Sequence, residues 1–363
     1  MNTFGKTIGL TIFGESHGLS IGAVLDGLPS GEAIDWDAVR SEMARRAPGK
    51  NKMSTARSEK DAFEVQSGFF NGHTTGTPLC AIIRNSDQHS RDYDQLRHIM
   101  RPGHADYSGK IRYGGFNDYR GGGHFSGRLT APLVFAGAIA SQILARHGIT
   151  VGSHILRLAG IADKPFDAAG ETAETLQALK KETLPVLDKA QAGPMEEKIL
   201  EAKNDLDSVG GVIECMVTGL PAGIGDPFFD SVESQLSHMM FSVPAVKGIE
   251  FGDGFALADL RGSQANDAFY YDGDAVKTRT NHNGGINGGI TNGMPVVFRL
   301  AVKPTASISQ KQETIDTDTK ENCDLVIKGR HDSCIVQRAI PVVEAAAAWA
   351  ILDVCLSEKG RCW

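Results

Sequence analysis

Residues 211–223 read Gly-Val-Ile-Glu-Cys-Met-Val-Thr-Gly-Leu-Pro-Ala-Gly, and they are the clearest guide to the fold of this 363-residue chain. An apolar run leads into a Gly-Leu-Pro-small-Gly ending, which predicts a strand followed by a turn. Residues 21–31, Ile-Gly-Ala-Val-Leu-Asp-Gly-Leu-Pro-Ser-Gly, have the same ending. Each stretch precedes an expected helix, over Asp35 to Arg46 and over Asp230 to Phe241. The two halves of the chain therefore carry related patterns, which indicates an internal duplication.

The halves also correspond further along the chain. Glycine-rich turns lead into expected strands at 79–84 and 296–302. Each half ends in an alanine-rich helix with a proline near its expected first turn, over Pro132 to Arg146 and Pro341 to Leu356. Small residues on all sides of these helices predict backbones that pack closely in an interior. We expect an α+β fold in which helices are layered between antiparallel sheets.

The predicted organisation is a single domain over residues 1–363. Its halves span about 1–150 and 208–363, and because they differ in length the chain is not a solenoid. In the segment between them, about 163–207, Glu, Lys, Ala and Leu recur at helical spacing. This segment is expected to be an insertion of exposed helices that carries no chemistry.

Composition excludes several classes of protein. The chain has 37 basic and 44 acidic residues, for a net charge of −7. Proteins that bind nucleic acid or anionic membranes usually have an excess of cations, so neither partner is expected. The most apolar stretch, Ala345 to Leu352, is shorter than the ~20 residues that cross a bilayer. The six cysteines form no CxxC pair and no zinc-binding spacing, which predicts a cytoplasmic protein with reduced thiols and no metal site.

Residues 14–18, Gly-Glu-Ser-His-Gly, match the G-x-S-x-G pattern in which Ser16 would be the nucleophile of a serine hydrolase. That motif requires a helix directly after the serine, whereas residues 19–26 predict a strand. A hydrolase is therefore the weaker interpretation of this motif. The stronger one is a hairpin turn that exposes Ser16 and His17.

Cations and glycines gather at three places that suit an anionic ligand. A loop in this acidic protein carries five cations, Arg45, Arg46, Lys50, Lys52 and Arg57. Three glycines, 121–123, precede the first alanine-rich helix, whose N-terminus favours a negative charge. Residues 329–332, Gly-Arg-His-Asp, precede the second such helix. Two helix starts of this kind predict a composite site that binds several negative groups and supplies acid–base residues.

Six segments together resemble the chorismate synthase family. They include Gly-Glu-Ser-His-Gly, Arg-Pro-Gly-His-Ala-Asp, Lys-Pro-Thr and Gly-Arg-His-Asp, and they lie, in the family's order, at residues 14–29, 101–106, 118–123, 287–293, 303–305 and 329–332. The resemblance implies a β-α-β sandwich that forms a homotetramer and binds reduced FMN. It also implies anti-1,4-elimination of phosphate from 5-enolpyruvylshikimate 3-phosphate to give chorismate, the last step of the shikimate pathway, with no net redox change.

By position in these motifs, the resemblance implies a role in proton transfer for three residues. His17 would protonate the departing phosphate, and His104 would protonate the reduced flavin or stabilise its charge. Asp332 would help to deprotonate flavin N5, which then removes the substrate proton. Ser16 and Ser126 would support these steps.

The resemblance also implies the residues that bind the two ligands. Arg46, Lys52 and Arg128 would hold the substrate. The implied cofactor-binding set is His124, Phe125, Ser126, Arg128, Gly288, Lys303, Pro304, Thr305, Ala306, Ser307 and Arg330. The chain has no separate dinucleotide-binding unit, so NADPH would act only indirectly, through an external flavin reductase.

The chain departs from the family after the triple glycine. His124, Phe125 and Leu129 stand where Arg, Ser and Glu are common in the family. An alternative is therefore a non-catalytic relative that binds FMN without turnover.

Overall fold

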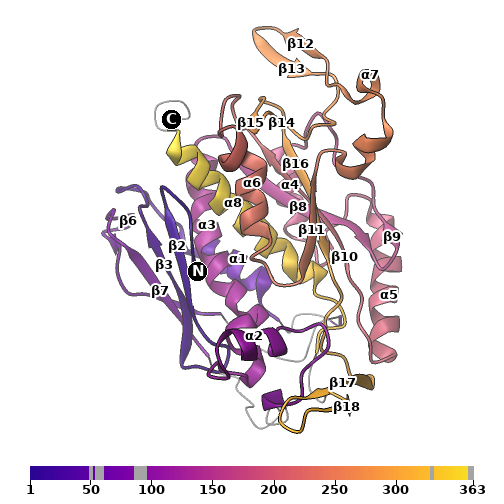
Figure 1. The fold of residues 1–363 in the computed structure, drawn as a ribbon. Helices are drawn as coiled ribbons and strands as arrows, with labels where there is room; N and C mark the ends of the chain where they lie inside the picture. Colours follow the sequence, from indigo (N-terminus) through magenta and orange to yellow (C-terminus); the bar gives the residue numbers. More distant parts are fainter. Residues whose placement is uncertain (49–51, 54–60, 86–95, 328–330, 359–363) are drawn as a thin grey trace.

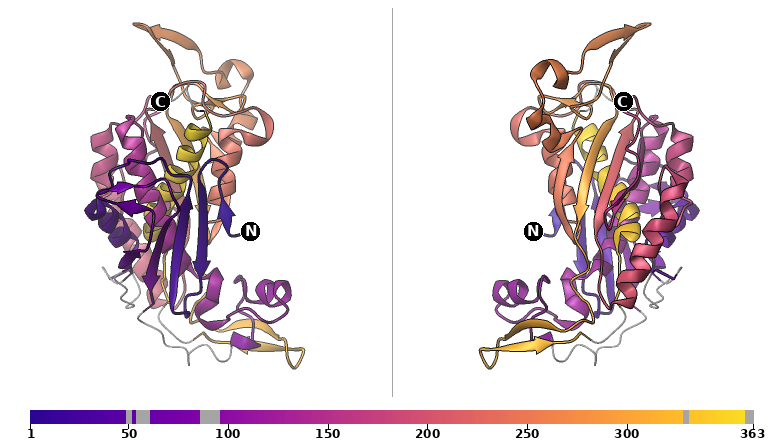
Figure 2. Two further views of the ribbon diagram at one scale, coloured as in Figure 1. Left: turned by 90° about the vertical axis from the view of Figure 1, so that its left-hand side faces the viewer. Right: turned by 90° about the vertical axis from the view of Figure 1, so that its right-hand side faces the viewer.

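The computed structural model describes residues 1–48, 52–53, 61–85, 96–327 and 331–358. Two five-stranded antiparallel sheets lie on either side of a layer of helices (Figures 1 and 2). The first sheet has the strand order β1 (Thr3–Phe4), β2 (Gly9–Gly14), β3 (Ser20–Asp26), β7 (Leu79–Arg84) and β4 (Phe63–Val65). The second has the order β11 (Val246–Phe251), β16 (Val296–Val302), β10 (Gly211–Thr218), β8 (Thr150–Leu158) and β9 (Ile161–Ala162). The expected α+β class and the strands at 79–84 and 296–302 are confirmed.

Helices α3 (Thr130–Arg146) and α8 (Val336–Ser357) form the centre of the molecule. Helix α3 contacts strands of both sheets and packs along α8. A Cβ added to Gly137 would lie only 2.2 Å from the Ala345 Cα, so the two backbones approach as closely as glycine allows. The apolar side chains of both helices therefore fill one continuous core.

Helix α8 differs from the sequence-based expectation in two respects. It begins at Val336, so Pro341 lies inside the helix rather than near its first turn. Its apolar stretch is also longer than the expected eight residues, Ala345 to Leu352. By length and composition, α8 could cross a bilayer, and so could the segment Gly127–Arg146, which contains α3. The α8 window is 100% buried and the other is 83% buried, as in the core helices of a globular fold.

Four further helices lie around the central pair and beside the second sheet. Helix α1 (Trp36–Arg46) packs on α3, and α6 (Val232–Met240) packs on α8, close to the ranges expected for both helices. Helices α4 (Ala173–Leu179) and α5 (Ala192–Asn204) lie within the segment predicted to be an insertion, beside the second sheet (Figure 1).

Short elements extend from the two ends of the molecule. The hairpin of β12 (Phe269–Asp272) and β13 (Ala275–Thr278) projects at the top of Figure 1, with α7 (Gly262–Ala265) near its base. Helix α2 (Asp106–Arg112) and the hairpin of β17 (Gln312–Asp316) and β18 (Glu321–Leu325) lie at the opposite end. The smaller pairs are β5 (Phe69–Phe70) with β6 (His73–Thr74), and β14 (Ile286–Asn287) with β15 (Ile290–Thr291).

Candidate active site

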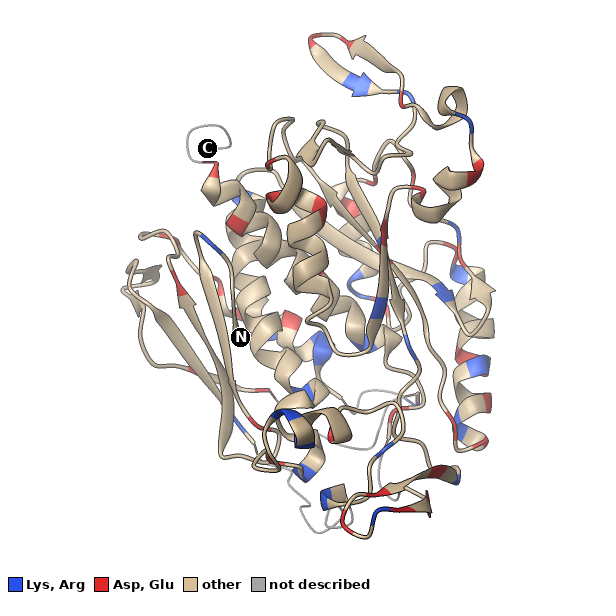
Figure 3. Ribbon diagram, in the orientation of Figure 1, with Lys and Arg blue, Asp and Glu red and all other residues tan. Residues whose placement is uncertain are grey.

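A cavity of about 890 Å³ lies at the N-terminal ends of α3 and α8. In Figure 3 these N-terminal ends point towards the bottom of the picture, and Lys and Arg are present near them. Among the described residues that line it, Asp332 is the only carboxylate. Most of the predicted site residues line it, namely Arg46, His104, His124, Phe125, Ser126, Arg128, Lys303, Pro304, Thr305, Ala306, Ser307 and Asp332.

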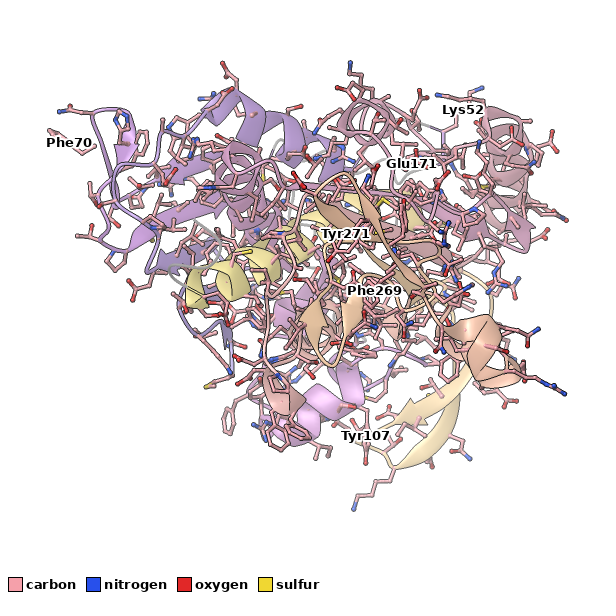
Figure 4. All side chains as sticks on the ribbon, turned by 90° about the horizontal axis from the view of Figure 1, so that it is seen from above. Lys52, Phe70, Tyr107, Glu171, Phe269 and Tyr271 are labelled. Carbon is pink, nitrogen blue, oxygen red and sulfur yellow. The ribbon has the colours of Figure 1, made fainter. Side chains whose placement is uncertain are left out.

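Three predicted ligand-binding residues are not among the described residues that line the cavity. Lys52 is exposed, and its carbonyl accepts a hydrogen bond of 2.7 Å from Lys203 of α5, so its backbone is held beside the outer helix (Figure 4). Gly288 lies in the turn between β14 and β15, and Arg330 lies outside the described residues. The structure does not bring Lys52 or Gly288 to the cavity. No cluster of three or more potential metal ligands is present in the described parts of the chain.

The triple glycine has a conformation that other residues rarely adopt. Gly121, Gly122 and Gly123 have φ angles of 58°, 84° and 53°, all in the left-handed region. A Cβ on Gly121 would lie 2.1 Å from Cε1 of His17, and one on Gly122 would lie 3.3 Å from Cε1 of His104. The glycines therefore let the main chain pass directly against both predicted acid–base histidines.

Ser16 and His17 are both buried, which corrects the expectation that the hairpin turn exposes them. The main chain of the triple-glycine loop covers them, and Gly121 itself lines the cavity. The Ser16 Oγ lies 3.2 Å from the Arg120 and Gly121 carbonyls and from the His17 Nδ1. Strand β3 rather than a helix follows this turn, so the nucleophile geometry of a serine hydrolase is absent there.

His104 belongs to a buried charged cluster that the sequence analysis did not identify. Its Nδ1 lies 2.6 Å from Oδ1 of Asp106, and Arg101 binds both oxygens of the same carboxylate at 2.7 and 2.8 Å. Burial by itself would raise the pKa of Asp106. The hydrogen bonds from Arg101 and His104 outweigh burial and hold that pKa well below its usual range.

Arg46 and Arg128 share one carboxylate. Asp61, whose side chain is fully buried, accepts a 2.8 Å hydrogen bond from Arg46 Nε and forms an ion pair with Arg128. Arg46 also contacts the Thr130 hydroxyl at 3.2 Å, at the start of α3. Burial lowers the pKa of Arg46 although Asp61 opposes this shift. These contacts form a clamp of Arg46, Asp61 and Arg128, in which one carboxylate fixes two predicted substrate-binding guanidinium groups at the cavity wall.

The segment 303–307 follows β16 and faces the turn that carries His104. Lys303 Nζ donates a hydrogen bond to the Gly103 carbonyl, and Arg101 Nη1 donates to the Ser307 hydroxyl at 3.2 Å. The Thr305 hydroxyl is buried and has no hydrogen-bond partner among the described residues. This segment therefore presents a cation and an unused hydroxyl at the cavity.

Asp332 lines the cavity in the segment just before α8. It forms an ion pair with Arg338, whose Nε also donates to the Arg46 carbonyl at 3.3 Å. The neighbouring His331 lines the cavity, and its Nε2 has no partner within the described parts of the chain. Burial and the positive charge of Arg101 lower the pKa of His331, so this imidazole is mostly neutral at pH 7.

The two unusual residues after the triple glycine have structural partners. His124 Nδ1 donates to the Gly14 carbonyl at 2.8 Å. The Phe125 ring fills the space beside Gly109 of α2, where a Cβ would lie 2.5 Å from the ring. The ring centroid of Phe125 is 6.2 Å from that of Tyr113. Both side chains, His124 and Phe125, therefore have partners within the fold.

Comparisons with known proteins identify the family of the chain. The family model described as chorismate synthase matches residues 8–356. Chorismate synthase of Chitinophaga pinensis is 46% identical over 360 residues, which cover 99% of this chain and 98% of the relative. Chorismate synthase of Dehalococcoides mccartyi strain BAV1 is 45% identical over 355 residues, covering 98% and 96%. A crystal structure of chorismate synthase, 27% identical in sequence, matches the fold with a TM-score of 0.77 over 99% of this chain and 95% of that one. From this match over nearly its full length, the chain belongs to the chorismate synthase family.

Proposed function

We propose that the cavity holds reduced FMN and 5-enolpyruvylshikimate 3-phosphate together during the family's reaction. The reaction itself follows from family membership: a lyase of the shikimate pathway forms chorismate. It removes one ring proton and one phosphate from the substrate. The observation that carries the proposal is the charge of the cavity wall. Among the described residues, six Arg and Lys side chains line it, whereas the carboxylates that line it or pair with these cations are three, Asp61, Asp106 and Asp332; the cations are Arg46, Arg101, Arg128, Lys247, Lys303 and Arg338. Such a wall offsets the repulsion between two anionic ligands.

The residues present fit a phosphate-bearing cofactor. The cavity volume lies within the range of sites that enclose small ligands, about 300–1,000 Å³. Lys303, Ser307 and the unpartnered hydroxyl of Thr305 would hold the FMN phosphate. Reduced FMN, when bound, supplies an electron transiently and takes up the substrate proton.

The roles of the chain's own residues follow from their positions. His104 and Asp332 both line the cavity, where His104 would donate or hold a proton and Asp332 would accept one. His17 would act from behind Gly121, which lines the cavity and has no side chain between the His17 ring and the loop. Arg46 and Arg128 would hold the substrate anions, and Ser16 and Ser126 would support the proton transfers.

The experiment is anaerobic and uses purified protein, chemically reduced FMN and the substrate, with chorismate followed by its absorbance. Chorismate that forms only when FMN is present would support the proposal. Absence of chorismate, while a known chorismate synthase is active in the same mixture, would refute it. FMN binding measured by fluorescence without any turnover would instead favour the non-catalytic relative. A fluorophosphonate should not label the buried Ser16 hydroxyl.

We also propose that the chain assembles into a homotetramer in the cytoplasm, receives reduced flavin from an external reductase, and binds neither nucleic acid nor membrane. The hairpin β12–β13 supports self-association, because Phe269, Tyr271 and Val276 share one exposed apolar face of it (Figure 4). Light scattering of the wild type and of Tyr271→Lys would test this: a tetramer that the variant weakens is expected, and a monomeric wild type would refute it.

The fold is proposed to be a β-α-β sandwich that arose by duplication, as one domain with an insertion at about 163–207. The two Gly-Leu-Pro-small-Gly turns support this proposal. Gly27 and Gly219 have φ angles of 77° and 83°, and Gly31 and Gly223 have 86° and 99°. The related sequences therefore adopt the same left-handed conformations at equivalent positions.

A further inference from the structure

We propose that Asp106 is a positioning residue that holds His104 in one tautomer and one orientation, and that Arg101 keeps Asp106 ionised for that purpose. This inference rests on the proposed function, because it assumes that His104 works in the cavity. It adds residues to the site that neither the motifs nor the family resemblance assigned.

The first step is the hydrogen bond between His104 and Asp106. The Nδ1···Oδ1 distance is 2.6 Å, and an ionised carboxylate can only accept a hydrogen bond. Arg101 Nη2 also lies 3.1 Å from Nδ1, but it already donates to Oδ1 of Asp106 at the shorter distance of 2.8 Å. The 2.6 Å contact with the carboxylate therefore assigns the proton to Nδ1, which leaves Nε2 as the nitrogen that can gain or lose one. Such a partner fixes both the tautomer and the ring plane of a working histidine.

The second step is the ionisation of Asp106. Arg101 donates to both carboxylate oxygens, and its own main-chain N–H lies 3.2 Å from Oδ2. Both side chains are more than nine-tenths buried. The fixed guanidinium favours the charged carboxylate, so Asp106 orients the imidazole instead of taking its proton.

The third step is the link from this cluster to the rest of the site. Arg101 also donates to Ser307, and Lys303 donates to the Gly103 carbonyl, so the 303–307 segment braces the turn from the opposite side. A Cβ on Gly122 would lie 3.4 Å from Nε2 of His104, which places that nitrogen against the glycine loop at the cavity. The ring is thus held at both edges.

Other charged groups also lie near His104. Arg101 is 3.1 Å from its Nδ1, and Lys303 bonds to the carbonyl of the preceding residue, Gly103. Neither cation can accept a hydrogen bond from the ring, so Asp106 is the acceptor that orients it. Replacing the Asp106 carboxylate therefore removes the contact that holds the imidazole.

The test is Asp106→Asn in the full chain, assayed with reduced FMN. We expect kcat to fall about 10- to 100-fold, as for other partners that orient a functional histidine, with a smaller change in KM. We also expect Asp106→Glu, which keeps the carboxylate, to restore part of kcat. The matched control is Asp316→Asn, which removes a similar His98–Asp316 contact of 3.0 Å outside the cavity and should leave kcat unchanged.

An unchanged kcat in Asp106→Asn would overturn the inference, while an active wild type would leave the proposed function intact. If the variant does not fold, ¹⁵N NMR of histidine-labelled wild-type protein decides the matter, with His104 assigned by comparison with His104→Gln. A proton on Nδ1 of His104 supports the inference, and a neutral ring protonated only at Nε2 overturns it.

Discussion

Gly121→Ala tests whether the triple glycine serves the histidines or only the turn. The new Cβ would lie 2.1 Å from Cε1 of His17, 2.3 Å from its Nδ1 and 2.9 Å from Oγ of Ser16, whereas ordinary contacts begin at 3.4 Å. The His17 ring or the loop must therefore move by more than 1 Å. A displacement of about 1 Å at a working group can cost about 100-fold in rate. We expect kcat to fall by about that factor.

Stability gives the second half of the prediction. A non-glycine residue in the left-handed region costs about 1–2 kcal/mol. Unfolding entropy is about 2 cal/mol/K per residue, so for 363 residues one degree corresponds to about 0.8 kcal/mol. The conformational cost alone should lower Tm by about 1–3 °C.

Gly115→Ala is the matched control. Gly115 has a φ of 82° and has no atom within 4 Å of its added Cβ, so this variant bears the same backbone cost without the contact. By differential scanning fluorimetry, Gly115→Ala should show only the loss of Tm from the backbone cost, and Gly121→Ala should lose more because its Cβ also overlaps His17. Only Gly121→Ala should lose activity in the anaerobic chorismate assay. Equal, near-wild-type rates in the two variants would show that the contact with His17 does not matter for turnover.

Three further predictions follow from buried charges and from the cofactor. Asp61→Asn leaves two buried guanidinium groups without their shared carboxylate, which should cost about 3–5 kcal/mol, or about 4–6 °C of Tm; a loss below 1 °C would contradict the clamp. Burial by itself would lower the pKa of His154, but its hydrogen bonds to Asp163 and Glu214 outweigh burial and raise that pKa. The protonated imidazole therefore stabilises the fold fully below about pH 6.5, and this stabilisation is lost as pH rises through the raised pKa. The difference in Tm between wild type and His154→Gln should shrink as pH is raised above about 6.5. Purified protein given NADPH and oxidised FMN should form no chorismate until a flavin reductase is added; formation without it would show that the chain reduces its own flavin.

The parts of the site that sequence predicts best are those fixed by local pattern. Glycine clusters and helix starts mark where the chain must turn, and the family resemblance implied roles for His104, Ser126 and Asp332 beside them, which the fold then brings to one cavity. Long-range burial carries no such local signal. Asp61 belongs to none of the motifs described above. Lys52 belongs to the basic loop, but the fold brings Arg46 of that loop to the cavity and leaves Lys52 beside α5.

Arg101 and Asp106 are an intermediate case. They flank His104 within Arg-Pro-Gly-His-Ala-Asp, so the signal for a charged cluster was present in the sequence. Spacing alone does not say whether an Asp two residues after a His turns back to it or continues along a helix. The tight turn at Gly103, with a φ of 67°, decides this, because it brings the side chains of residues 101, 104 and 106 together.

The closeness of α3 and α8 connects the core to the chemistry. Both helices begin at the cavity and run away from it side by side, so the positive ends of two helix dipoles lie at the same wall as the cations. That placement depends on Gly137, where a Cβ would lie 2.2–2.4 Å from three atoms of Ala345. A larger residue there would separate the helices and move Arg128, just before α3, away from Asp332, just before α8. The small residues of the buried helices therefore set the width of the active site as well as the packing of the core.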